Sequence, residues 1–129
     1  MTSFVLKFKI EVKMNTFKIK TKTKNGILII YPYGHLDAHH VEKFENEIKK
    51  HIKNKYYKIL INCKDLNYIS SAGMGVIMGY LEEVREKNGD IKLCSLNKTV
   101  YEIFDLVGFT EIYDFLDSEE QGLKKFNEL

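Results

Sequence analysis

The chain has 129 residues, 44% of them hydrophobic and 29% charged, which fits one globular domain with a single core. Seven lysines and one acidic residue give residues 1–25 a net charge of +6. Because the whole chain has a net charge of +2, residues 26–129 have a net charge of −4. This part of the chain therefore lacks the excess of positive charge that is typical of nucleic-acid binding. Apolar runs are shorter than the roughly 18–20 residues that cross a bilayer, and lysines interrupt any signal-peptide core. We therefore expect a cytoplasmic protein that binds neither nucleic acid nor a membrane.

The first segment, residues 1–13, stands apart from the rest. Its stretch LKFKIEVK (6–13) alternates like a β-strand, and Met14 follows it directly. One interpretation is a loose tail upstream of a start at Met14, and the other is an added edge strand that pairs with another chain. We favour the tail, because chain ends are commonly disordered, and place the folded domain at residues 14–129.

A β-hairpin is predicted next. Residues 16–24 (TFKIKTKTK) alternate strictly, Asn25-Gly26 is the strongest short hairpin signal, and residues 27–33 (ILIIYPY) indicate a buried strand.

Helical and strand patterns then alternate to the end of the chain. Helices are predicted over residues 38–54, 72–87, 98–107 and 118–128, and strands over residues 58–63, 91–95 and 110–115. This order predicts an α/β fold: a single domain whose mostly parallel sheet is opened by the antiparallel hairpin, with four helices. Cys63 and Cys94 fall within apolar runs, which indicates buried, reduced thiols.

Two strand-to-helix junctions should meet at one edge of this sheet, where such folds commonly bind their partners. Asp37 precedes the first helix and is positioned to cap it, and Ser70-Ser71 precede the second. Capping alone explains a serine at this point. It does not explain Gly73, Gly75 and Gly79, each of which costs about 1 kcal/mol relative to Ala inside a helix, so a functional role for Ser71 also stays open.

Enzymatic and metal sites fit the sequence poorly. The position two residues before Ser71 is Ile69 rather than the glycine of a nucleophile elbow, and no Gly-Lys-Ser/Thr phosphate loop occurs. The segment HLDAHH (35–40) is rich in imidazoles, but the adjacent His39 and His40 would diverge by about 100° on a helix. We therefore expect no enzyme activity, no metal and no cofactor.

Three motifs, in this order, resemble those of STAS-domain anti-sigma factor antagonists. They are Gly34-His35-Leu36-Asp37, the stretch DLNYISSAGMGV (65–76), and the C-terminal pair Leu106-Val107-Gly108-Phe109 and Glu120-Gln121-Gly122-Leu123. The resemblance covers residues 14–129.

This resemblance implies a partner switch. The unphosphorylated antagonist binds an anti-sigma factor that is also a serine kinase, which frees a sigma factor; phosphorylation breaks the complex, and a serine phosphatase restores it. The family's target serine commonly follows an Asp and precedes a second Ser or Thr. This register selects Ser71, although this chain has Ser70 in the Asp position and Ala72 in the position of the second hydroxyl. Ser70 is the alternative target. We expect a monomer when free. The partner-binding residues are then predicted to be Asp37, His35, Ser70, Gly73 and Met74. The alternative function is a STAS module that is never phosphorylated and serves as a structural or ligand-sensing interaction domain.

Overall fold

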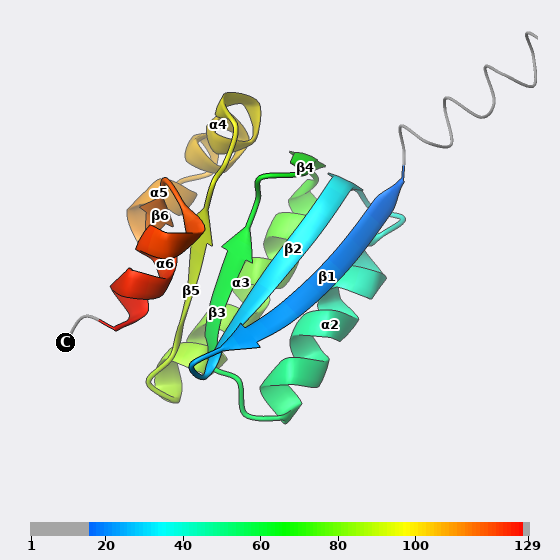
Figure 1. The fold of residues 1–129 in the computed structure, drawn as a ribbon. Coiled ribbons are helices and arrows are strands. Elements are labelled where there is room, and N and C mark those ends of the chain that lie inside the picture. Colours follow the sequence, from blue (N-terminus) through cyan, green and yellow to red (C-terminus); the bar gives the residue numbers. More distant parts are fainter. Residues whose placement is uncertain (1–15, 128–129) are drawn as a thin grey trace, which may run out of the picture.

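The computed structural model describes residues 16–127, in which a six-stranded sheet carries helices on both faces (Figure 1). The tail or extra strand predicted at residues 1–13 lies outside this range. The strands are β1 (Phe17–Lys24), β2 (Ile27–Leu36), β3 (Lys58–Asn62), β4 (Leu66–Ile69), β5 (Asp90–Cys94) and β6 (Phe115–Leu116). The helices are α2 (Val41–Lys53), α3 (Ser71–Glu86), α4 (Lys98–Leu106), α5 (Phe109–Ile112) and α6 (Glu119–Phe126). None of the helices within residues 16–127 has the length and apolar character needed to cross a membrane.

The predicted hairpin is confirmed. β1 and β2 pair in antiparallel register, and Asn25 and Gly26 both have positive φ angles, of 52° and 79°, as a two-residue type I′ turn requires. β2 then pairs in parallel with β3 through its first half and with β4 through its last three residues. The strand order β1-β2-β3-β5-β6, with β4 beside the end of β2, confirms a mostly parallel sheet opened by a hairpin.

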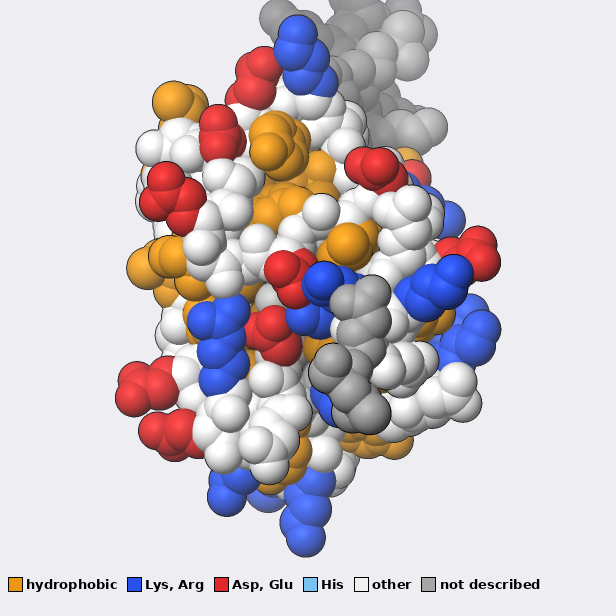
Figure 2. Space-filling view, turned by 90° about the vertical axis from the view of Figure 1, so that its left-hand side faces the viewer, with side chains coloured by type: hydrophobic (Ala, Val, Ile, Leu, Met, Phe, Trp, Pro, Cys, Tyr) orange, Lys and Arg blue, Asp and Glu red, His pale blue; other side chains and the backbone are white. Residues whose placement is uncertain are grey.

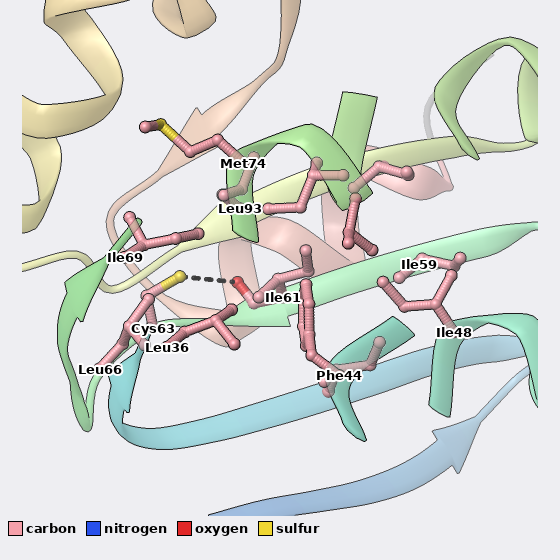
Figure 3. Close-up of a cluster of buried hydrophobic side chains, with 14 of the residues drawn as sticks. Leu36, Phe44, Ile48, Ile59, Ile61, Cys63, Leu66, Ile69, Met74 and Leu93 are labelled. Carbon is pink, nitrogen blue, oxygen red and sulfur yellow. Dashed lines mark hydrogen bonds between the residues drawn. The ribbon is translucent and has the colours of Figure 1, made fainter. Parts of the chain in front are cut away.

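The main core lies between the sheet and the helices α2 and α3 (Figure 3). Phe44 and Ile48 lie on one side of α2, and both are completely buried against the sheet. Burying a side chain of this size contributes about 1.5–3 kcal/mol. On the opposite face, Leu123 and Phe126 of α6 pack over a smaller cluster that includes Ile29.

Both cysteines are buried and unpaired, as predicted. Cys63 packs in the core on the α2 and α3 side (Figure 3), whereas Cys94 belongs to the cluster under α6. Burial raises the pKa of both thiols, that of Cys94 to about 11, so neither is a thiolate at neutral pH.

The segment 110–115 is not the predicted strand. Gly108 takes up a left-handed conformation (φ 84°) after α4, and the chain turns into the short helix α5 before the two residues of β6. This turn stacks the Phe109 ring on that of Tyr113, at 4.7 Å between centroids, and sets it 5.0 Å from that of Phe104. Aromatic packing therefore outweighs the β-propensity of the segment, and the fold has five helices among the described residues instead of four.

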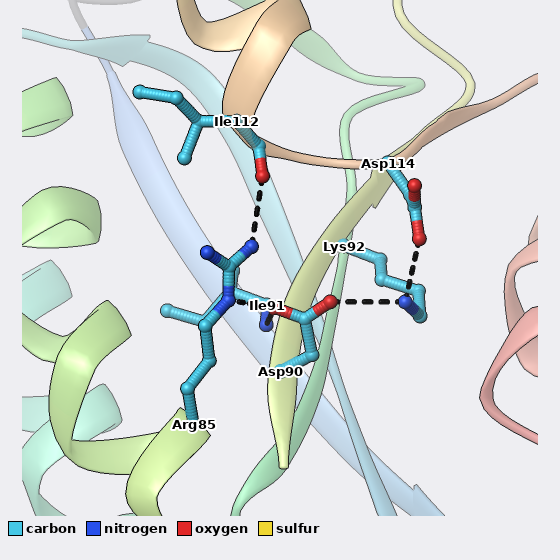
Figure 4. Close-up of polar contacts among 6 residues, drawn as sticks. All are labelled: Arg85, Asp90, Ile91, Lys92, Ile112 and Asp114. Carbon is cyan, nitrogen blue, oxygen red and sulfur yellow. Dashed lines mark hydrogen bonds and ion pairs between the residues drawn. The ribbon is translucent and has the colours of Figure 1, made fainter.

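A network of ion pairs and hydrogen bonds links the end of α5 and the segment after it to β5 and α3 (Figure 4). The buried Lys92 ammonium donates to Asp90 Oδ2 at 3.0 Å and to Asp114 Oδ2 at 2.7 Å, and Arg85 bonds both Asp90 and the carbonyl oxygen of Ile112. Burial lowers the pKa of Lys92, but its hydrogen bonds to Asp114 and Asp90 outweigh burial, so the pKa is raised. The hydrogen bond from Lys92 lowers the pKa of Asp114, so both groups are charged at neutral pH.

Candidate functional site

The two strand-to-helix junctions lie side by side, as the topology predicts. Leu36, the last residue of β2, pairs with Ile69, the last residue of β4. The backbone N–H of Ser70 then donates to the carbonyl oxygen of Leu36 at 2.9 Å. This hydrogen bond ties the loop after β4 to the loop after β2 and sets Asp37 beside the start of α3.

Asp37 does not cap the first helix, so this prediction is wrong. A turn over residues 38–40 separates it from α2, which begins at Val41 after His40, a residue that makes no side-chain cap. Asp37 Oδ1 instead accepts from the backbone N–H of His39 at 3.0 Å and lies 2.9 Å from His40 Nδ1, within ion-pair distance but without hydrogen-bond geometry. The carboxylate therefore stabilises the turn and stays partly exposed at the edge.

The serine that caps α3 is Ser70, not Ser71. α3 begins at residue 71, one position earlier than predicted, and Ser70 Oγ accepts from the backbone N–H of Gly73 at 3.2 Å. Ser71 is the first helical residue, and its side chain is exposed. One hydroxyl is thus engaged by the fold, while its neighbour projects from the N-terminus of a helix.

Gly73 and Met74, both predicted to contact a partner, are buried. A Cβ on Gly73 would lie 2.9 Å from Ile69 Cγ1 and 3.0 Å from Leu36 Cγ, so only glycine lets α3 approach the ends of β2 and β4 this closely. Met74 is only 6% exposed and lies in the core (Figure 3). Packing accounts for both residues.

A second set of α3 residues, of which the sequence had indicated only Gly75 and Gly79, faces outward next to Ser71. Met78 is 56% exposed, and Gly75 and Gly79 have nothing within 4 Å of where a Cβ would stand. Residues four, seven and eight positions after Ser71 lie on the same side of a helix as Ser71, so this spacing could have identified them from the sequence. We call Ser71, Ala72, Gly75, Met78 and Gly79 the α3 outer face.

The three histidines of the first junction do not converge. The His35 ring lies 6.1 Å from that of Tyr68, and its Nδ1 is buried without a hydrogen-bond partner among the described residues. His40 instead stacks on Phe17, and His39 is exposed. Over residues 16–127 the structure contains no group of three or more His, Cys, Asp or Glu side chains arranged to hold a metal ion.

The C-terminal motifs act mainly in packing. Gly108 has the positive φ that ends α4, and Phe109 is buried after it. A Cβ on Gly122 would lie 2.7 Å from Leu60 Cδ1, so glycine allows α6 to rest on the sheet. Leu106 and Val107 are exposed, at 86% and 54%, on the side of the molecule that carries α4, α5 and α6, where hydrophobic and charged side chains are interspersed (Figure 2).

The sequence and the fold of this chain are similar to those of a known protein family. Residues 18–122 match the STAS domain. The chain belongs to the STAS domain family.

Sequence relatives of this STAS domain include the anti-sigma F factor antagonist of Paenibacillus polymyxa, 27% identical over 107 residues, which are 82% of this chain and 92% of that protein. The fold is similar to that of the Thermotoga maritima protein TM1081, with a TM-score of 0.80 and 21% identity over 85% of this chain and 95% of the other. It is also similar to that of the anti-sigma factor antagonist SpoIIAA of Bacillus. Its unphosphorylated form gives a TM-score of 0.73 at 23% identity (85% and 95% covered), and its phosphorylated form gives 0.66 at 22% (85% and 98% covered).

The division of roles between the two serines predicts different effects on stability. Ser70→Ala removes the α3 cap and should lower the free energy of unfolding by about 1 kcal/mol. Ser71→Ala removes an exposed hydroxyl and should change it by less than about 0.5 kcal/mol. Urea unfolding measures both, with Ser118→Ala as a matched control, because Ser118 Oγ caps α6 by accepting from the N–H of Gln121. An equal loss for Ser71→Ala would contradict this assignment.

Proposed function

We propose that this protein is an anti-sigma factor antagonist whose unphosphorylated form binds an anti-sigma factor with serine kinase activity, frees a sigma factor, and is released when Ser71 is phosphorylated. A serine phosphatase would then restore the binding form. The observation that carries the proposal is the exposure of Ser71 at the first position of α3, beside a serine that the fold already uses. A kinase needs an accessible hydroxyl, and Ser71 provides one.

The position also suits a phosphoryl group. Phosphorylation adds about −1.5 to −2 charges, and the free N–H groups and the dipole at the start of α3 favour negative charge there. The domain therefore remains folded when Ser71 is modified. The new charge instead changes the surface at the edge where the Asp37 carboxylate also lies.

A partner bound at this edge would meet two negative groups in place of one. Unpaired like charges at an interface cost several kcal/mol, and each 1.4 kcal/mol weakens binding tenfold. This supports a switch between bound and released forms without a change of fold. Asp37 and His35 remain predicted contacts of the partner on the β2 side of the edge.

The α3 outer face supplies the rest of the proposed contact surface. Gly75 and Gly79 weaken the helix, and nothing in the described part of the chain needs their lack of a side chain. Small residues beside the exposed Met78 let a partner backbone approach α3 closely. Ser71 lies at the end of this surface, so a phosphoryl group there would interrupt it.

A second candidate function is a STAS module that is never phosphorylated and acts as a structural or ligand-sensing interaction domain. The residue that favours it is Ser70, which stands where phosphorylated members of the family commonly have Asp. Intact mass of the protein isolated from its native cells separates the two candidates. Only the switch produces a species heavier by one phosphoryl group.

The switch predicts opposite behaviour of two Ser71 variants in partner capture. Tagged Ser71→Ala, incubated with native lysate, should retain an anti-sigma factor with serine kinase activity, whereas Ser71→Asp should not retain it, because its carboxylate imitates part of the phosphoryl charge. The free energy of unfolding of Ser71→Asp should lie within about 1 kcal/mol of that of the wild type, since aspartate is favourable at a helix start. Ser118→Asp introduces the same charge at the cap position before α6, away from the proposed surface, and should leave capture intact. Equal capture by Ser71→Asp would refute the switch.

The outer-face glycines predict a gain of stability combined with a loss of binding. Gly75→Ala should raise the free energy of unfolding by about 0.5–1 kcal/mol, because alanine favours the helix and meets no neighbour. The added methyl group should weaken partner binding about fivefold or more, by overpacking a close contact. Titration calorimetry with the captured partner measures this, with Glu86→Ala at the far end of α3 as the control. Unchanged affinity of Gly75→Ala would remove the α3 outer face from the interface.

A further inference from the structure

One region of the sheet has no helix over it. α6 packs on β3, β5 and the first half of β2, while α2 and α3 cover the opposite face. Among the described residues, β1, the second half of β2 and β4 are therefore uncovered on the α6 side, where β1 and β2 lie open to the viewer in Figure 1.

The side chains on this region follow from strand alternation. Phe17 and Ile19 of β1 pack into the main core, so the lysines between and after them face the other way. Tyr31 of β2 belongs to the cluster under α6, and Tyr33 lies two residues further on the same face. We call Lys18, Lys20, Lys22, Tyr33, His35 and Tyr68 the open sheet face.

Lysines and aromatic rings form two parallel rows on this face. Lys18 is paired with Tyr33 in the hairpin register, and Lys20 with Tyr31. The aromatic row continues through His35 to Tyr68, whose rings are 6.1 Å apart. Side chains of alternate residues along a strand stand roughly 6.5 Å apart, so the lysine row of β1 repeats at that interval, while Tyr68 lies beside His35 on the neighbouring strand β4.

The two tyrosines and the three lysines of these rows are exposed, whereas His35 between them is half-buried. Tyr33 is 51% exposed and Tyr68 is 41% exposed, although aromatic side chains of this size usually contribute to a core. Lys18, Lys20 and Lys22 are exposed, and none of them forms an ion pair with the described residues 16–127. Positive charge and aromatic surface are therefore both available to a ligand.

A pocket extends the lysine row towards α6. It has a volume of about 580 Å³, and Lys20, Lys22 and Lys64 line it. Its acidic residues are Asp65 and Glu119, and the Glu119 carboxylate already accepts hydrogen bonds from the Tyr31 hydroxyl and from Asn62 Nδ2. Three lysines against two carboxylates leave the lining with an excess of one positive charge, and Lys22 and Lys64 also act electrostatically on Glu119.

We propose that the open sheet face binds single-stranded nucleic acid, with the lysines of β1 on the phosphates and the rings of Tyr33 and Tyr68 stacked on bases. Single-strand binders combine a positively charged track with aromatic platforms, which is the arrangement seen here. An acidic protein partner matches it less well, because lysine is depleted from protein–protein interfaces. Paired bases in a duplex are not free to stack on the rings. The proposal does not depend on the switch at Ser71.

Fluorescence anisotropy of the full chain with labelled oligothymidylate and oligouridylate tests the proposal. Binding should be measurable at low salt and should weaken steeply as salt increases. The affinity of the double variant Tyr33→Ala/Tyr68→Ala should fall at least about tenfold. The variant Tyr33→Phe/Tyr68→Phe, which keeps both rings, should bind with the affinity of the wild type. Replacing Lys18, Lys20 and Lys22 by Gln should reduce the slope of log affinity against log salt by about 2.

Matched controls separate the face from overall charge. Lys43→Gln/Lys49→Gln/Lys53→Gln removes the same charge from exposed positions of α2, and Tyr101→Ala removes an exposed ring from α4; both should bind like the wild type. No binding of either oligonucleotide at low salt would overturn the proposal. So would an unchanged Tyr33→Ala/Tyr68→Ala variant, or equal losses in the controls. Tighter binding of a polyglutamate peptide than of the oligonucleotides would identify an acidic protein as the occupant instead.

Discussion

The hydrogen bond from the Ser70 N–H to the carbonyl oxygen of Leu36 is the constraint on which the functional edge depends. It joins two residues that are 34 positions apart in the chain, at the ends of β2 and β4, and holds the two helix starts together. Ser70 also caps α3 through its hydroxyl, so both of its polar groups on this side are engaged. The next residue, Ser71, is therefore fixed in position without being used by the fold, which is the condition for a reversible modification that leaves the domain intact.

The two sides of α3 differ in how closely they are packed. Its inner side, with Gly73 and Met74, is fitted so closely to the ends of β2 and β4 that a single methyl group has no room. Its outer side has open space at Gly75 and Gly79, where a methyl group meets nothing. Gly73 and Gly75, only two positions apart, thus stand in opposite environments, one filled and one open, and the sequence alone does not distinguish them.

Most of the fold was predictable because local chemistry determines it. Asn25-Gly26 defines the hairpin by its turn preference, and the spacing of Phe44 and Ile48 defines the buried side of α2. β4 was missed because it has only four residues and its pairing with β2 shifts register between Gly34 and His35. α5 was misread as a strand because its formation depends on the stacking of Phe109 with Phe104 and Tyr113, which are contacts made in three dimensions.

The site was predictable as a place but not in its division of roles. Sequence patterns put Asp37 and Ser70-Ser71 at one edge, yet a helix start that differs by one residue decides which serine is the cap. Charge counted along the chain likewise gave no sign that β1 presents its lysines on the same face as Tyr33, because counting does not register which face a strand residue occupies.

The most direct test of the central claim is to map the phosphate on the protein isolated from its native cells, by fragment mass spectrometry. The claim is that Ser70 belongs to the fold and Ser71 to the switch, so fragments cut between the two serines should carry the phosphate on Ser71 alone. Phosphate on Ser70 would contradict it, because that hydroxyl would then have to leave the Gly73 N–H that it caps.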